Sequence, residues 1–162
     1  MTQTATRTPT TTRPPVTVLV AEDDVLVARD IEETLGELGY EVASVVGSGR
    51  EAVEAARAER PDFALLDIRM PGELDGVDAG RVLIGELDVP VVYLTAYGDD
   101  ATLERALEVR PYGYVVKPFD PRELHSTLQV AMERKKVEDR LDASERRLAA
   151  TLRSIGEAVV TT

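Results

Sequence analysis

Five short apolar runs, each followed by a segment with helical spacing, occupy most of the chain between Val16 and Ala131. Continuous runs of β-branched and aliphatic residues are typical of strands that are buried on both faces of a sheet. Five alternations of strand and helix predict an α/β fold, a doubly wound sandwich around a five-stranded parallel sheet. The runs are VTVLV (16–20), VASVV (42–46), FALLD (63–67), VVYLT (91–95) and YVV (114–116).

The helical segments between these runs have recognisable ends. Val27, Ile31 and Leu35 recur at helical spacing after the first run, and Gly39 is expected to end that helix. The other helices are expected over residues 50–59, 77–87 and 100–109 and from Pro121 onwards.

Reactive side chains stand where four of the runs end. Glu22 and Asp23 follow the first run, Asp67 closes the third, Thr95 the fourth and Lys117 the fifth. Because sites in doubly wound sheets form at the carboxyl ends of the strands, we expect these five side chains to lie together. Clustered carboxylates repel one another unless a cation lies among them, and oxygen ligands favour Mg²⁺.

The same residue types fit one reaction class, phosphoryl transfer. Asp67 can act as a carboxylate nucleophile, and a metal can neutralise the charge on the transferred group. Lys117 can pair with Asp67 or hold a phosphoryl oxygen by charge, and Thr95 can donate a hydrogen bond to the same oxygen.

Four segments in this order and spacing, VLVAEDD, FALLDIRMPG, VVYLTA and GYVVKPF, resemble the signature of response-regulator receiver domains of two-component signalling. The resemblance covers residues 16–134. It implies the flavodoxin-like (βα)5 fold and a phosphorylatable switch in which Asp67 accepts a phosphoryl group from a histidine kinase or a phosphotransfer protein.

The resemblance also implies individual roles. Asp23 and Asp67 would ligate Mg²⁺ directly, together with the backbone carbonyl of Arg69, and Glu22 would act through water. Lys117 would pair with the phosphoryl group, and the Lys117–Pro118 bond would be cis, which X–Pro bonds tolerate.

The switch implied by the family couples Thr95 to Tyr114. Phosphorylation would draw the Thr95 hydroxyl inward, and the Tyr114 ring would follow into the vacated space. This is a shift between two pre-existing states, driven by affinity for the phosphoryl group. The alternative for Tyr114 is a purely packing role.

Two features depart from the usual family pattern. The loop MPGELDG (70–76) is one residue longer than usual, which leaves the path into the third helix open. Arg69 and Tyr97 occupy two variable positions that tune dephosphorylation in this family, and neither is an acid or amide that would position water. We therefore hypothesise slow autodephosphorylation.

Several residues have simpler interpretations. Gly47-Ser48-Gly49 lacks the lysine of a phosphate-binding loop and is expected to lead into a helix. His125 is expected at the surface, because a phosphotransfer histidine needs its own helical hairpin. Arg122, Lys135 and Lys136 are interpreted as solvated helix charges.

Composition narrows the function classes. The chain has no cysteine, which excludes disulfides and thiolate metal sites. Its net charge of −11 argues against nucleic acid and anionic membranes as direct partners. We expect a cytoplasmic protein that contains no kinase domain and is not an enzyme. Its chemistry is limited to phosphorylation of itself from a donor and autodephosphorylation.

The domain organisation predicted from the sequence has four parts. Residues 1–15 are a disordered Thr- and Pro-rich leader, 16–134 the receiver domain, 135–156 a helical linker, and 157–162 the truncated start of a PAS-like domain whose first strand is AVV. The linker and the last core helix are expected to form a homodimer through a coiled coil, although Ser144 and Thr151 fall on its seam. A single charged helix is the alternative. The seam residues are Leu124, Leu128, Val137, Leu141, Leu148 and Ile155.

Two other functions remain open. One is a pseudo-receiver, a dimerisation module that works without phosphorylation. The other is a haloacid-dehalogenase-like phosphatase, which requires a second aspartate two residues after the nucleophile, where this chain has Arg69.

Overall fold

The computed structural model describes residues 14–96 and 98–160, with side chains described as far as Ile155. Its five strands form one parallel sheet in the order β2-β1-β3-β4-β5, which confirms the predicted flavodoxin-like doubly wound fold. The strands are β1 (Thr17–Ala21), β2 (Glu41–Val46), β3 (Phe63–Asp67), β4 (Val91–Ala96) and β5 (Gly113–Lys117).

Each strand is followed by a helix whose ends match local sequence signals. Asp24 caps the first helix by accepting from two backbone N–H groups, and Gly39 follows its end with a φ of 91°. Ser48 caps the second, so the Gly47-Ser48-Gly49 segment leads into a helix as predicted. The helices are α1 (Val25–Glu37), α2 (Gly49–Glu59), α3 (Gly76–Gly85), α4 (Asp100–Glu108) and α5 (Pro121–Val160).

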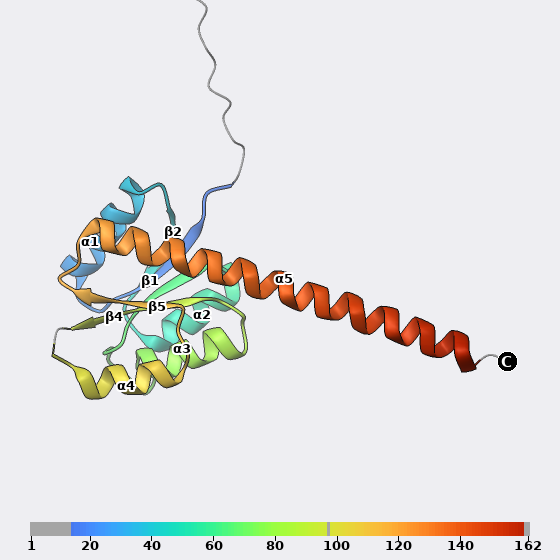
Figure 1. Ribbon diagram of the computed structural model, residues 1–162. Helices are drawn as coiled ribbons and strands as arrows, with labels where there is room; N and C mark the ends of the chain where they lie inside the picture. The colour runs from blue at the N-terminus through green and yellow to red at the C-terminus, as the bar shows by residue number, and fades with distance from the viewer. Residues whose placement is uncertain (1–13, 97, 161–162) are drawn as a thin grey trace, which may run out of the picture.

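The core consists of two apolar layers, one on each face of the sheet, which is covered by helices on both sides (Figure 1). Alternate residues of β1 serve the two layers, with Leu19 on one side and Val20 on the other. Helices α2, α3 and α4 cover the Leu19 face, and α1 and α5 cover the Val20 face. The core is built mainly of aliphatic side chains, with Tyr93 among its largest fully buried members.

The strand order reverses beside β1, which determines where a site can form. The chain leaves β1 for α1 on one face and leaves β3 for α3 on the other face. The two loops therefore diverge and leave a crevice at the carboxyl ends of neighbouring strands.

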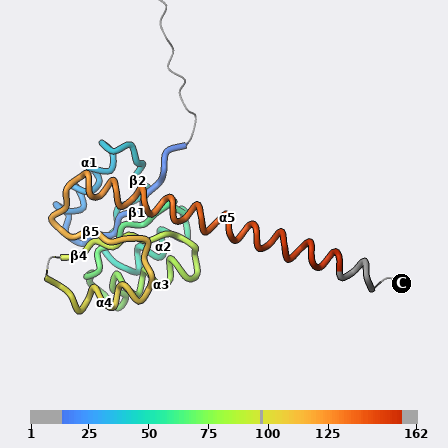
Figure 2. Tube along the Cα trace, viewed as in Figure 1, coloured from blue at the N-terminus to red at the C-terminus, as the bar shows by residue number. Residues whose placement is uncertain are grey.

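Helix α5 extends far beyond the sheet (Figures 1 and 2). It continues through Val160, so the AVV segment (158–160) is helical here, and the predicted strand is wrong. A strand needs a neighbour to satisfy its backbone hydrogen bonds, whereas a helix satisfies them internally. Within the described ranges, no helix combines the length and apolarity required to cross a membrane. Residues 1–13 of the predicted leader, Tyr97 and residues 161–162 lie outside the described residues.

Candidate functional site

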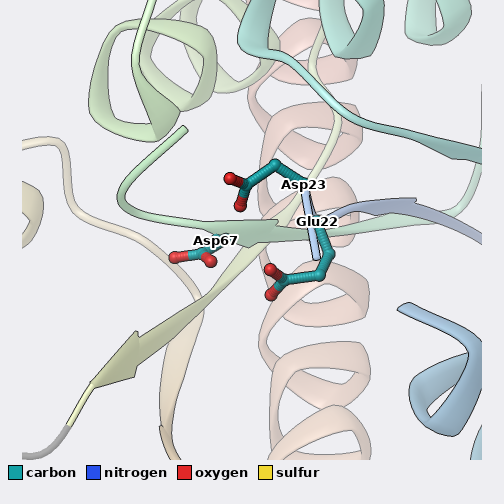
Figure 3. A group of neighbouring side chains, drawn as sticks. All are labelled: Glu22, Asp23 and Asp67. Carbon is teal, nitrogen blue, oxygen red and sulfur yellow. The ribbon is translucent and has the colours of Figure 1, made fainter. Parts of the chain in front are cut away.

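Three carboxylates meet at the carboxyl edge of β1 and β3. Asp67 is the last residue of β3, and Glu22 and Asp23 directly follow β1, the neighbouring strand. One carboxylate oxygen from each residue lies within 4.8 Å of the others, and Figure 3 shows the three side chains gathered at this edge. Glu22 and Asp67 are 4% and 7% exposed, whereas Asp23 is exposed. The predicted acidic cluster therefore forms, with one member open to solvent.

Lys117 brings a positive charge into this cluster from β5. Its Nζ lies 2.9 Å from Oδ2 of Asp67 and 2.9 Å from Oε2 of Glu22. The pairing with Asp67 was anticipated from the sequence, but the pairing with Glu22 was not. The Lys117–Pro118 peptide bond is cis, as the family resemblance implied.

Burial and neighbouring charges shift the pKa values of Glu22 and Lys117. Burial raises the pKa of Glu22 to about 7, and the negative charge of Asp67 adds to that rise. Hydrogen bonds from Lys117 and from the backbone N–H of Asp24 oppose the rise without cancelling it. Burial alone would lower the pKa of Lys117, but its bonds to Asp67 and Glu22 outweigh burial and raise it. The site therefore holds a charged ammonium between the carboxyl groups of Glu22 and Asp67.

Thr95 and Tyr114 line a cavity of about 350 Å³ beside the acidic cluster. Thr95 is 3% exposed, and its hydroxyl donates to the carbonyl oxygen of Ala96 at 3.4 Å. Tyr114 on β5 is 46% exposed, so its ring is far from buried. Asp99 and Leu103 complete part of the wall from the side of α4. The two predicted switch residues thus share one cavity.

Arg69 has two contacts of different kinds. Its backbone N–H donates to Oδ1 of Asp67 at 3.1 Å, which orients the carboxylate. Its guanidinium points away and pairs with Asp99, the residue preceding α4, at 2.6 Å. This ion pair lowers the pKa of Asp99.

A second ion pair joins the same two regions. Arg105 of α4 donates to Asp75 at the start of α3 at 3.2 Å. Both pairs were missed from the sequence, because each joins residues 30 positions apart on different segments. Only the spatial neighbourhood of the β3–α3 loop and α4 brings them together.

The long loop after β3 enters α3 through a capping box. Asp75 accepts from the backbone N–H of Asp78, and Asp78 accepts from that of Asp75. A Cβ on Gly76 would lie 2.0 Å from the backbone oxygen of Asp67, so only glycine permits this approach. The path into α3 is therefore a capped turn in which Gly76 packs directly against the backbone of Asp67.

The single histidine is less exposed than predicted. His125 packs edge-on against Tyr40, and its Nδ1 lies 3.4 Å from the tyrosine hydroxyl. It lies in α5, on the side facing α1 and β2, and takes no part in the acidic cluster.

Comparison with known proteins agrees with this geometry. The transcriptional regulatory protein PdtaR of Mycobacterium tuberculosis is 38% identical over 120 residues, which cover 74% of this chain and 58% of that protein. The DNA-binding response regulator MtrA of Mycobacterium leprae is 38% identical over 117 residues, covering 72% and 51%. The chain thus spans about half the length of these curated relatives.

Solved structures give the same result. The signal receiver domain of a modulated diguanylate cyclase from Desulfovibrio desulfuricans G20 superposes with a TM-score of 0.73 at 38% identity, covering 77% of this chain and 99% of that one. The receiver domain of sensor histidine kinase PA1611 from Pseudomonas aeruginosa PAO1, solved with a magnesium ion coordinated in its active site cleft, gives 0.64 at 35% identity, covering 72% and 96%. The sequence model of the response regulator receiver domain matches residues 18–129. This chain belongs to the response regulator receiver domain family.

Proposed function

We propose that Asp67 accepts a phosphoryl group from the phosphohistidine of a histidine kinase or a phosphotransfer protein. The observation that carries the proposal is the 2.9 Å contact between Asp67 and Lys117 inside a crevice that also holds Glu22 and Asp23. An oxygen of Asp67 attacks phosphorus, the bond from phosphorus to the donor nitrogen breaks, and the histidine nitrogen takes up a proton. Lys117 then shifts its contact from the carboxylate to a phosphoryl oxygen.

The residues fit a Mg²⁺ ion. Their donors are carboxylate oxygens within 4.8 Å of one another, and Asp23 is exposed on the open side. Asp23, Asp67 and the carbonyl of Arg69 would hold the ion, with Glu22 acting through water. When bound, Mg²⁺ neutralises charge on the phosphoryl group.

The signal is proposed to pass through Thr95 and Tyr114. The hydroxyl of Thr95 would exchange the carbonyl of Ala96 for a phosphoryl oxygen, since its present bond is long at 3.4 Å. Movement of Tyr114 into the neighbouring cavity, about 350 Å³ in volume, would follow. Helix α4 suits such a change because Ala106 is its one buried residue.

Slow autodephosphorylation remains our proposal for Arg69 and Tyr97. The Arg69 guanidinium is held by Asp99 and leaves no carboxylate or amide at this position to orient an attacking water. When release of phosphate is followed over time, we expect a phosphoryl half-life of hours. A half-life of seconds would contradict the proposal.

We further propose that the receiver domain (16–134) relays its state through the linker (135–156) to a downstream sensor or output domain. A homodimer formed through α5 would carry the change to that domain. The pseudo-receiver and the haloacid-dehalogenase-like phosphatase are the competing functions.

The intact mass of the chain after incubation with acetyl phosphate and Mg²⁺ tests these alternatives. We expect a gain of one phosphoryl group, about 80 Da, that is lost in Asp67→Asn and in EDTA. Asp142→Asn, which changes an exposed aspartate of α5, is the matched control and should retain the gain. An unchanged mass would favour the pseudo-receiver, and many turnovers of a small phosphoester would favour the phosphatase.

A further inference from the structure

Helix α5 has two parts with different surroundings. Leu124, Leu128 and Ala131 in its first part are fully buried in the core. Two of these, Leu124 and Leu128, were predicted on the coiled-coil seam, so that part of the prediction is wrong: they serve the receiver domain instead. The later part of α5 projects from the domain (Figure 1).

A group of polar contacts marks the point where α5 leaves the domain. Arg134 lies over the ring of Tyr112, with its guanidinium carbon 4.5 Å from the ring centre, and donates to the carbonyl of Pro111 at 3.0 Å. The hydroxyl of Tyr112 donates to Glu138. Lys135 pairs with Asp88 at 2.7 Å and is 18% exposed, so it is not the solvated charge predicted. We call these contacts the exit clamp.

Beyond the exit clamp, exposed apolar side chains follow a heptad pattern. Val137, Leu141, Leu148 and Ile155 are between 55% and 61% exposed. Their spacing assigns Leu141, Leu148 and Ile155 to position a and Val137 to position d. Ser144 and Thr151 occupy the remaining d positions, and small polar residues there weaken a coil without blocking it. An apolar stripe exposed along one side of a helix is stabilised when a partner buries it.

The charges beside the stripe select the partner and its direction. Arg140 and Glu145 occupy positions g and e, which flank the seam, and both are exposed. In a parallel coil, position g of one helix faces position e of the next heptad of the other, so Arg140 faces Glu145 twice. In an antiparallel coil g faces g and e faces e, which sets Arg140 against Arg147 and glutamates against each other.

We propose that residues 137–155 form a parallel, in-register, two-stranded coiled coil with a second copy of this chain, in which Arg140 of each copy pairs with Glu145 of the other. This specifies the homodimer included in the proposed function. The coil begins at Val137, at the end of the exit clamp, because Arg134, at the preceding a position, is held over Tyr112. Both receiver domains then lie at the same end of the coil.

The absence of cysteine from the sequence allows a direct test by disulfide cross-linking of the full chain. Leu141→Cys and Leu148→Cys are oxidised separately and analysed without reductant. A parallel, in-register coil places each cysteine opposite itself, so both variants should cross-link efficiently. Arg146→Cys, at position f on the outer face, is the control and should cross-link poorly. An antiparallel coil can bring at most one of the two positions opposite itself, so cross-linking of one variant or of neither overturns the proposal.

Sedimentation equilibrium tests the charge pairing. Arg140→Glu or Glu145→Arg should each weaken the dimer by about tenfold, since each places like charges opposite one another twice. The combined exchange should restore the dissociation constant, and Arg146→Glu should leave it unchanged. A monomer at all concentrations, or no restoration by the exchange, contradicts the proposal.

The result is separable from the phosphorylation chemistry. Dimerisation is measured without a phosphoryl donor and should be equal in Asp67→Asn. The variant Leu141→Glu/Leu148→Glu should be monomeric yet still gain one phosphoryl group. If the stripe instead binds a different protein, the purified chain alone should be monomeric, and that outcome would count against the second copy.

Discussion

The ammonium of Lys117 lies between the carboxyl groups of Glu22, which follows β1, and Asp67, the last residue of β3. Its replacement in Lys117→Gln leaves Glu22 and Asp67 close together with no cation between them. We expect a loss of roughly 1–3 kcal/mol in the free energy of unfolding at pH 8 without metal, because a buried charge without its partner is costly.

Urea denaturation of both proteins measures this loss. Lys136→Gln is the control, since Lys136 pairs with Glu133 only on the helix surface, at 3.4 Å. That change should stay within about 0.5 kcal/mol. Equal effects of the two substitutions would show that Lys117 has no structural role in the cluster.

Most site residues were predictable from the sequence because strand ends converge. Asp67 and Lys117 close their strands, and in a doubly wound sheet such positions share one edge. The Lys117–Glu22 contact and the Arg69–Asp99 pair were not predictable, because a long side chain can reach several neighbours and its choice depends on packing. The sequence thus predicted which carboxylates lie together, but not which hydrogen bonds they accept.

At the scale of elements, the start of α3 depends on one carboxylate. Asp75 caps the helix and pairs with Arg105, and these bonds outweigh burial and lower its pKa from the ordinary value of 3.8. A lowered pKa means that the folded state favours the charged form. The resulting stability is therefore present above pH 3.8 and is lost as pH falls through the lower folded pKa.

We expect Asp75→Ala to lower the free energy of unfolding by about 1–2 kcal/mol at pH 7, measured by urea denaturation. The difference from the unsubstituted chain should shrink as the pH falls below 3.8. Asp75→Asn keeps a capping oxygen and removes the charge, so it should lose less stability at neutral pH. A difference that is constant with pH would contradict the charge-based explanation.

Packing of α3 on the sheet depends on a glycine. A Cβ at Gly80 would lie 1.9 Å from the hydroxyl oxygen of Tyr93, which is fully buried. We expect Gly80→Ala to lower stability by about 1–3 kcal/mol through overpacking. Gly36→Ala, in a helix and with open space around it, should raise stability by up to about 1 kcal/mol. The midpoint of thermal unfolding of each variant, compared with that of the unsubstituted chain, tests both predictions. An unchanged midpoint for Gly80→Ala would show that α3 can shift to make room.

Element boundaries were largely predictable, and the exceptions have physical causes. The strand FALLD matches β3 completely, since all five residues are buried. The end of α5 was predicted wrongly at 158–160, where β-branched residues favour a strand but none of the described strands is adjacent. Propensity describes a residue in an average environment, and this segment follows a long uninterrupted helix.

For the molecule as a whole, α5 should show two levels of protection from hydrogen exchange. Residues 121–131 share the receiver core, and their amides should exchange only with global unfolding. Residues 140–155 are stabilised by the second copy under our proposal, so dilution should accelerate their exchange and leave the first part unchanged. Mass spectrometry of peptides at two protein concentrations measures this. Equal protection of both parts at high dilution would show that the extension is stable alone.

The exit clamp has a mechanical consequence. Residues 139–160 continue α5 beyond it and would span about 33 Å at 1.5 Å per residue. A rigid rod held at its root converts rotation into displacement, so each degree of tilt at the clamp moves the far end by roughly 0.6 Å. A reorientation too small to disturb the core could therefore displace the far end by several ångströms. Under the proposed relay, the receiver and its helix would act as a lever that turns about the contact between Arg134 and Tyr112.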